Sequence, residues 1–91
     1  MRTRNDYRSF ILEYVRPQLS LLGLDPASAP DDLDLLETGL IDSLGVLELA
    51  AAIGSEFGIE VDIYEMDPDD LTVVGRLSDF LAGSHQNRFG A

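Results

Sequence analysis

The sequence predicts an all-α fold, a small bundle of three to four helices with a long loop after the first. Apolar residues recur at helical spacing in three separate stretches, and suitable capping residues flank them. The length of 91 residues allows one domain with a modest core. We expect this domain to cover residues 1–83 and residues 84–91 to form a disordered C-terminal tail.

The first helix is expected over residues 3–16. Thr3 and Asp6 match a capping box, in which each side chain satisfies the backbone N–H of the other. Pro17 disfavours helical geometry at the residue before it and predicts the end of the helix at Arg16. The residues that share the apolar face are Tyr7, Phe10, Ile11, Tyr14 and Val15.

Residues 17–42 form a long connection that is too apolar for a solvated linker. A short helical turn is expected around Asp31–Glu37, and Gly39 supplies backbone freedom for the turn that follows. Leucines are expected to anchor the connection to the helical core: Leu19, Leu21, Leu22, Leu24, Leu33, Leu35, Leu36 and Leu40.

The strongest helical pattern covers residues 43–58, with Gly58 as the expected C-terminal cap. One face carries the buried stripe Val46, Leu49, Ala50, Ile53 and Phe57. The opposite face carries a partly apolar strip, Leu44, Glu48, Ala51 and Ser55, with Leu47 at its border. This strip could be a partner surface, although single exposed leucines are common and need no explanation.

The last third of the chain predicts an extended segment at 59–64, a turn or short helix near 65–71, and a closing helix. We expect the closing helix to begin at Thr72 and to end at Gly83. Its core face is Val73, Val74, Leu77, Phe80 and Leu81.

The chain is strongly acidic, with 17 Asp and Glu against 6 basic residues and a net charge of −11. Residues 17–75 contain no Lys or Arg, so this segment should repel nucleic acid and anionic membranes and attract basic protein surfaces. Acidity that serves solubility alone is the alternative. Without an apolar signal segment or a membrane-length stretch, a cytoplasmic protein with no membrane insertion is expected.

Several chemistries lack the residues they need. His85 is the only histidine and there is no cysteine, so neither a histidine-based triad nor a thiolate metal site is expected. A nucleophile elbow around Ser43 would need glycine at Ile41. The acids of segment 67–70 do not match a calcium loop, because Pro68 interrupts them. We therefore expect no metal site and no catalysis by the chain alone.

Asp42 and Ser43 stand together immediately before the strongest helical pattern, and either side chain could cap the helix. A helix start also favours an anion, through free N–H groups and the positive end of the dipole. We expect Asp42 to cap the helix, which leaves the Ser43 hydroxyl free for modification, for example as a phosphodiester.

The run DLLETGLIDSLGVLELAAAIGSEFGIEV, residues 34–61, resembles the core of acyl, aminoacyl and peptidyl carrier proteins. The resemblance extends through the closing DLTVVGRLSDFL and implies an acyl-carrier-protein-like fold. It implies that Ser43 is the attachment site of 4′-phosphopantetheine and that Asp42 helps to bind the magnesium used by the transferase. The positions matching the family's recognition helix are Leu44, Leu47, Glu48 and Ala51.

The spacing around the Asp-Ser pair favours one type of carrier. Leu40 and Ile41 separate Gly39 from Asp42, and Gly45 follows the Asp-Ser-Leu signature. This arrangement resembles stand-alone carriers of D-alanine or of specialised-metabolite building blocks, including those of polyketide or nonribosomal peptide biosynthesis, more than fatty-acid carriers. The D-alanyl carriers, however, show Asp-Ser-Met.

The resemblance implies a stand-alone, monomeric carrier that holds an acyl or aminoacyl group as a thioester on the arm and moves it between enzymes. Its expected partners are a phosphopantetheinyl transferase, which uses coenzyme A, a loading enzyme and downstream enzymes of a specialised-metabolite pathway. A fatty-acid-type acyl carrier and a D-alanyl carrier are alternatives. An unmodified acidic helical adaptor, in which Ser43 is only a cap, is the alternative of another class. A small cargo is expected because Leu49, Ile53 and Phe57 already fill the buried stripe.

Overall fold

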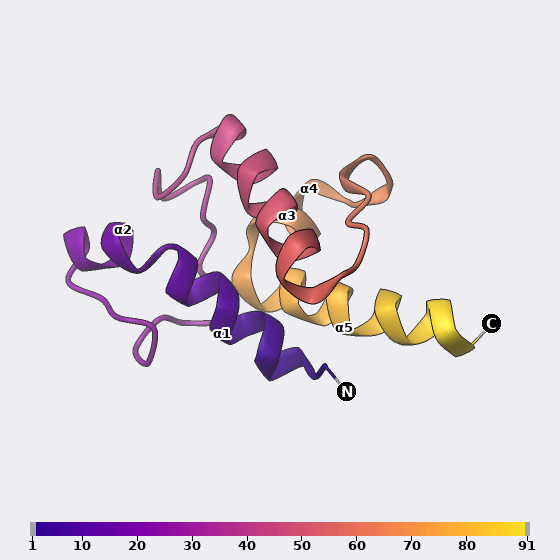
Figure 1. The fold of residues 1–91 in the computed structure, drawn as a ribbon. Coiled ribbons are helices and arrows are strands. Elements are labelled where there is room, and N and C mark those ends of the chain that lie inside the picture. Colours follow the sequence, from indigo (N-terminus) through magenta and orange to yellow (C-terminus); the bar gives the residue numbers. More distant parts are fainter. Residues whose placement is uncertain (1, 91) are drawn as a thin grey trace.

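The computed structural model describes the backbone of residues 2–90 and the side chains of residues 2–83 (Figure 1). Its helices are α1 (Arg4–Tyr14), α2 (Arg16–Leu21), α3 (Ser43–Phe57), α4 (Pro68–Thr72) and α5 (Val74–Gly90), with a 3-10 turn η1 (Ile63–Glu65). Within residues 2–90 the only extended pairing is a bridge between Asp34 and Val73. The predicted all-α bundle with a long loop is therefore confirmed.

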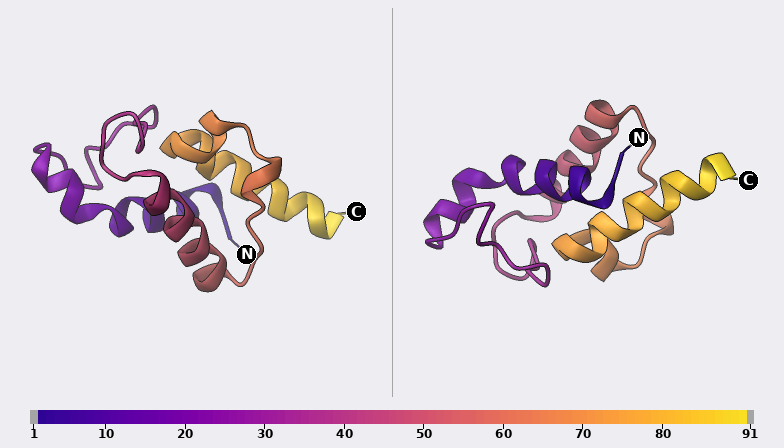
Figure 2. Two further views of the ribbon diagram at one scale, coloured as in Figure 1. Left: turned by 90° about the horizontal axis from the view of Figure 1, so that it is seen from above. Right: turned by 90° about the horizontal axis from the view of Figure 1, so that it is seen from below.

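Helix α1 packs against both α3 and α5, and α4 packs against α5 (Figures 1 and 2). The predicted capping box is present at the start of α1, where Thr3 Oγ1 accepts from the N–H of Asp6 at 3.2 Å and Asp6 Oδ2 accepts from the N–H of Thr3 at 2.8 Å. Tyr7 is fully buried, and its ring centroid lies 4.5 Å from that of Phe57 at the end of α3. Tyr14, expected in the core, is 41% exposed.

The sequence predicts that Pro17 ends helical structure at Arg16, but in the structure Pro17 lies inside a second helix. Helix α1 ends at Tyr14, and α2 then begins at Arg16 with Pro17 in its first turn. Proline is tolerated there because the N–H groups of a first turn have no intrahelical acceptor. The predicted loop 17–42 is therefore wrong over residues 17–21, which belong to α2.

The leucines between α2 and α3 divide into two groups. Leu19, Leu33, Leu35 and Leu40 are buried in the core as predicted. Leu21, Leu22 and Leu36 are exposed, so the prediction that they anchor the connection is wrong. Leu24 is half-buried against the core.

The connection is fastened to the junction of α4 and α5 by backbone hydrogen bonds. The N–H of Leu35 donates to the carbonyl of Thr72, and the N–H of Val74 donates to the carbonyl of Leu33, both at 2.9 Å. The segment Asp31–Glu37 consists of turns and this pairing, and the helical turn expected there is limited to one hydrogen bond, from the N–H of Thr38 to the carbonyl of Asp34 at 3.1 Å. Its backbone groups pair with residues far along the chain, which local propensity does not reveal.

An ion-pair cluster around Asp31 ties α1 to the connection and to α5. Arg8 Nε lies 2.6 Å from Asp31 Oδ1, and Arg4 Nη2 lies 2.8 Å from Asp31 Oδ2. Arg4 also pairs with Asp79 of α5, and Gly75 of α5 donates its N–H to the carbonyl of Asp31 at 2.8 Å. The cluster fixes one end of the segment that leads to α3.

The cluster predicts an acid-dependent loss of stability. Hydrogen bonds from Arg8 and then from Arg4 hold the pKa of Asp31 below its ordinary value. As the pH falls, the Asp31 carboxylate therefore binds a proton in the unfolded chain before it does so in the folded one. The contribution of the ion pairs to the unfolding free energy is complete above the unfolded pKa of about 3.9 and is lost as the pH falls through the folded pKa. Asp31→Asn should flatten the dependence of the unfolding free energy on pH below that value.

Chemical denaturation at several pH values measures this effect. Asp32→Asn is the control, because it removes a neighbouring exposed carboxylate for which the structure records no ion pair. The Asp31 side chain is 54% exposed, so the effect at neutral pH should be small. An acid slope that Asp31→Asn leaves unchanged would contradict the role of the cluster.

The C-terminal elements differ from the predicted boundaries. The expected short helix is α4, and α5 begins at Val74 rather than at Thr72. Helix α5 runs to Gly90, so the predicted end at Gly83 is wrong; Gly83 lacks the positive φ that ends α3 at Gly58. The side chains of residues 84–91 lie outside the described part; the division into a domain 1–83 and a tail stays a prediction, although the backbone of residues 84–90 continues α5. Within the described residues, no helix combines the length and the apolar character that crossing a membrane requires.

Candidate functional site

Asp42 caps the N-terminus of α3. Its backbone is extended, with φ −99° and ψ −174°, and its Oδ1 accepts from the N–H of Gly45 at 2.8 Å. Its own carbonyl accepts from the N–H of Val46 at 3.0 Å, the first hydrogen bond of the helix. Asp42 thus has the position and the hydrogen bond of an N-cap residue.

Ser43 is the first residue of α3, and its side chain is exposed. Its hydroxyl has no hydrogen-bond partner among the described residues, because Asp42 already serves as the cap. The N–H groups of Ser43 and Leu44 have no intrahelical acceptor, and the helix dipole is positive at this end. The hydroxyl is therefore sterically accessible at a place where added negative charge is tolerated.

The chain that enters α3 is held on the side away from solvent. Gly39 turns with φ +77°, a conformation that favours glycine, and Leu40 is buried. The N–H of Ile41 then donates to the carbonyl of Leu35 at 3.1 Å. Because Leu35 is itself bonded to Thr72, Ser43 stands on a scaffold that reaches across to α4.

The partly apolar strip on α3 faces outward as the periodicity predicts. Leu44 is 63% exposed and Leu47 is 47% exposed, and Glu48 and Ala51 are also exposed. The stripe on the other side is confirmed in the core, with Val46, Leu49 and Ile53 buried and Ala50 and Phe57 half-buried. Helix α3 therefore presents Ser43 and the strip to solvent together.

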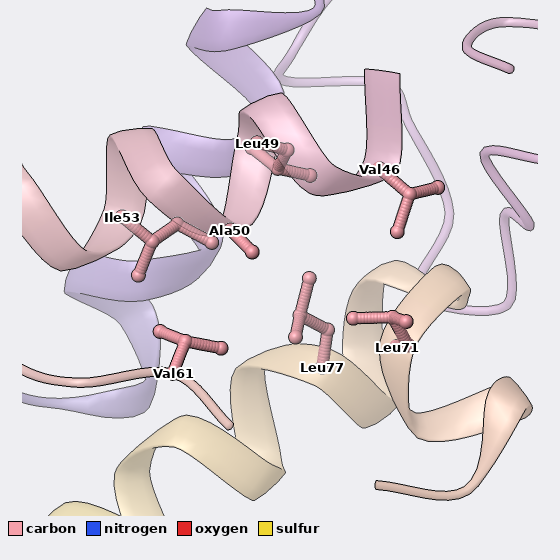
Figure 3. Close-up of a pocket in the computed structure, with 7 residues that line it drawn as sticks. All are labelled: Val46, Leu49, Ala50, Ile53, Val61, Leu71 and Leu77. Carbon is pink, nitrogen blue, oxygen red and sulfur yellow. The ribbon is translucent and has the colours of Figure 1, made fainter. Parts of the chain in front are cut away.

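The inner face of α3 meets Val61, Leu71 and Leu77 around a small apolar gap (Figure 3). The other residues that line it are Val46, Leu49, Ala50 and Ile53, whose side chains point toward α5 and the Val61 segment. The gap has no room for a water molecule. In this state the bundle has no open cavity at this place for a long apolar chain.

The charges of the described arginines are already engaged within the chain. Arg4 and Arg8 bind Asp31, Arg16 binds Glu13, Arg76 binds Asp70, and Arg2 lies 4.9 Å from the ring centroid of Phe57. Glu48 makes no ion pair within the described residues. The negative charge of Glu48 on the outward face of α3 is therefore not neutralised by any arginine whose side chain the structure describes.

One feature of the site was missed by sequence reasoning. Gly45 in the first turn of α3 lies so close to Ile41 that a Cβ atom on Gly45 would be 2.9 Å from Ile41 Cβ. The available signal was glycine at a helical position where most residues are more favourable. That signal does not identify the neighbour.

Comparison with known proteins places this arrangement in a family. Residues 19–81 match the family model described as "Phosphopantetheine attachment site". A solved structure titled "Structure of KstB-PCP(apo)" is similar over 91% of this chain and 90% of that chain, with a TM-score of 0.66 and 30% identity.

Curated relatives include D-alanyl carrier proteins. That of Lacticaseibacillus casei is 43% identical over 47 residues, which are 52% of this chain and 58% of the relative. That of Bacillus velezensis is 44% identical over 46 residues, 50% of this chain and 59% of the relative. The chain thus spans less than two thirds of the length of these relatives.

The family's cofactor is a covalently attached 4′-phosphopantetheine, and an exposed hydroxyl at a helix N-terminus fits such an attachment. The match covers residues 19–81, from α2 through most of the described core. The chain is a carrier protein of the phosphopantetheine-binding family.

Proposed function

We propose that this carrier bears its phosphopantetheine arm on Ser43 and holds a small acyl or aminoacyl unit there for transfer between biosynthetic enzymes. The observation that carries the proposal is the exposed Ser43 hydroxyl, without a hydrogen-bond partner among the described residues and directly after the Asp42 cap. When bound, the arm supplies a terminal thiol that holds the unit as a thioester. The chain has no cysteine of its own for this purpose.

The start of α3 supports a phosphodiester on Ser43. The free N–H groups of the first turn and the dipole stabilise a nearby negative charge by about 0.3–1 kcal/mol. Oδ1 of Asp42 is held by Gly45, while Oδ2 has no hydrogen-bond partner among the described residues. We propose that Oδ2 binds the magnesium ion used during modification, as the family resemblance implies.

The outward strip of α3 is the proposed docking surface for the transferase and the loading enzyme. Leu44 and Leu47 supply apolar area next to Ser43, and Ala51 lets a partner approach the helix closely. Glu48 supplies a negative charge in the middle of the strip. A partner with a basic, partly apolar groove would complement this surface.

The cargo is proposed to be small. The apolar gap between α3 and α5 has no room for a water molecule, so a long acyl chain would have to open the core. The D-alanyl carrier relatives favour an aminoacyl unit, with D-alanine as one candidate. A building block of a specialised-metabolite pathway is the other, supported by the spacing of Gly39, Asp42 and Gly45.

Modification in vitro tests the proposed attachment site. The protein is incubated with coenzyme A, magnesium and a broad-specificity phosphopantetheinyl transferase, and its intact mass is measured. The mass should rise by one phosphopantetheine, and fragmentation should locate the group on Ser43. A reaction without transferase is the control. An unchanged mass would favour the unmodified adaptor, and modification at another residue would move the site.

Loading of the modified protein tests the proposed cargo. A D-alanine-activating enzyme and the chain's own loading enzyme are compared over a panel of amino acids and acyl groups. Loading with the native unit should leave the methyl chemical shifts of Leu49, Ile53 and Leu77 nearly unchanged, because the unit stays outside the core. Large shifts of these core methyl groups would overturn the small-cargo proposal.

A further inference from the structure

Gly45 stands where the structure leaves no space for a side chain. A Cβ atom built on Gly45 would lie 2.9 Å from Ile41 Cβ and 3.3 Å from Asp42 Oδ1. Carbon atoms in favourable contact are about 3.5–4.0 Å apart, so any other residue would displace one of these neighbours. Ile41 and Asp42 are the two residues that immediately precede α3, and Asp42 is its N-cap.

Neither neighbour can move without consequence. The contact is made by the Cβ atom of Ile41, so relief requires a shift of its backbone. That backbone is tied by the hydrogen bond from the N–H of Ile41 to the carbonyl of Leu35, and Leu35 is fully buried. The Asp42 carboxylate is held by the N–H of Gly45 itself at 2.8 Å.

Glycine at this position is unfavourable for the helix taken alone. In a helix interior it is less favourable than alanine by about 1 kcal/mol, because it loses more backbone freedom on folding. The φ of Gly45 is not positive, so the backbone conformation does not require glycine. The close approach of Ile41 is the feature that does require it.

We propose that Gly45 is a positioning residue for the modification of Ser43, an inference that rests on the proposed function. Its missing side chain lets Ile41 lie directly against the first turn of α3. Asp42 is thereby held with one oxygen on the Gly45 N–H and the other free, next to an outward Ser43 hydroxyl. A side chain on Gly45 would move this carboxylate relative to the hydroxyl and leave the docking strip in place.

The test is the kinetics of phosphopantetheine transfer to Gly45→Ala. A displacement at the reacting groups lowers turnover without changing the docking surface, so we expect kcat to fall at least about tenfold and KM for the carrier to stay within about twofold. Gly54→Ala is the matched control on α3, because its Cβ would meet the carbonyl of Ile59 at 2.9 Å, far from Ser43. Its kcat should match that of the wild type even if its melting temperature falls.

A second substitution separates positioning from a general loss of structure. Ile41→Gly removes the Cβ atom that the new side chain would meet, so the double variant Gly45→Ala/Ile41→Gly should lose less in kcat than the product of the two single losses. Ile41→Ala keeps that atom and should give no such rescue. An unchanged kcat in Gly45→Ala, or equal losses in Gly45→Ala and Gly54→Ala, would overturn the inference. Failure of the proposed function is a different result, seen as an unmodified wild type or a modified Ser43→Ala.

Discussion

Ser43→Ala is expected to abolish modification by the transferase while leaving the fold nearly intact. The substitution removes the hydroxyl that we propose as the nucleophile, but the Asp42 carboxylate still accepts from the N–H of Gly45. The loss in unfolding free energy should be no more than about 1 kcal/mol, at the low end of the range for helix caps. Intact mass spectrometry and chemical denaturation measure the two effects on the same sample.

Asp42→Ala should lower the unfolding free energy more than Ser43→Ala does. It removes the cap and leaves the Gly45 N–H without its acceptor, so its cost should exceed that of Ser43→Ala and lie between about 0.5 and 2 kcal/mol. Ser9→Ala, on the exposed side of α1, is the control for Ser43→Ala, because it also removes a serine hydroxyl but should leave the protein fully modifiable. If Ser43→Ala were the more destabilising of the two, Ser43 would be the structural cap.

Helix α3 and the exposed position of Ser43 at its start could be predicted from the sequence because local signals there agree. The apolar period, the Asp42 cap and the terminal Gly58 all indicate the same helix, and the structure has it at Ser43–Phe57. The exposure of Ser43 then follows from helix geometry, since a first-turn side chain next to an efficient cap need not bond to the backbone.

The helix ends predicted from the sequence are wrong where one residue type is compatible with two conformations. Pro17 can end one helix or begin another, and here it lies in the first turn of α2. Gly83 is predicted to end α5, but its φ is not positive, unlike that of Gly58, and the helix continues through it. Sequence alone does not say which conformation a glycine adopts.

Non-local contacts account for the remaining differences. The pairing of Leu35 with Thr72, and the arginine cluster on Asp31, join segments that lie far apart in the chain. The close approach of Ile41 to Gly45 depends on the same scaffold, because Leu35 holds the N–H of Ile41. These contacts have no periodic signature, and they fix the direction from which the chain enters α3.

Glu48→Arg is expected to weaken docking to a cognate transferase or loading enzyme without weakening the fold. Glu48 is exposed and makes no ion pair within the described residues, so the unfolding free energy should change by no more than about 0.5 kcal/mol. Facing a basic partner groove, the new arginine would place like charges together. We expect KM for the carrier to rise by about tenfold or more and the salt dependence of association to decrease.

Ala51→Glu tests the apolar part of the same strip by another route. It places a charge where the helix is expected to lie closest to its partner, so a desolvation cost adds to lost packing. Glu56→Arg is the matched control for Glu48→Arg, with the same change of charge at an exposed position eight residues beyond Glu48, about 12 Å along the helix. KM should stay near the wild-type value in this control.

The combination of variants separates docking from chemistry. Glu48→Arg and Ala51→Glu should act mainly on KM, whereas Gly45→Ala should act mainly on kcat, because Glu48 and Ala51 lie at least one helical turn beyond the hydroxyl of Ser43. Thermal melts of each variant establish that the fold is retained. If both strip variants left KM unaltered with the fold intact, the partner would have to bind elsewhere. Asp32 and Glu37, two exposed acids of the segment Asp31–Glu37, would then be the next residues to reverse in charge, since the Asp31 carboxylate is already bound by Arg4 and Arg8.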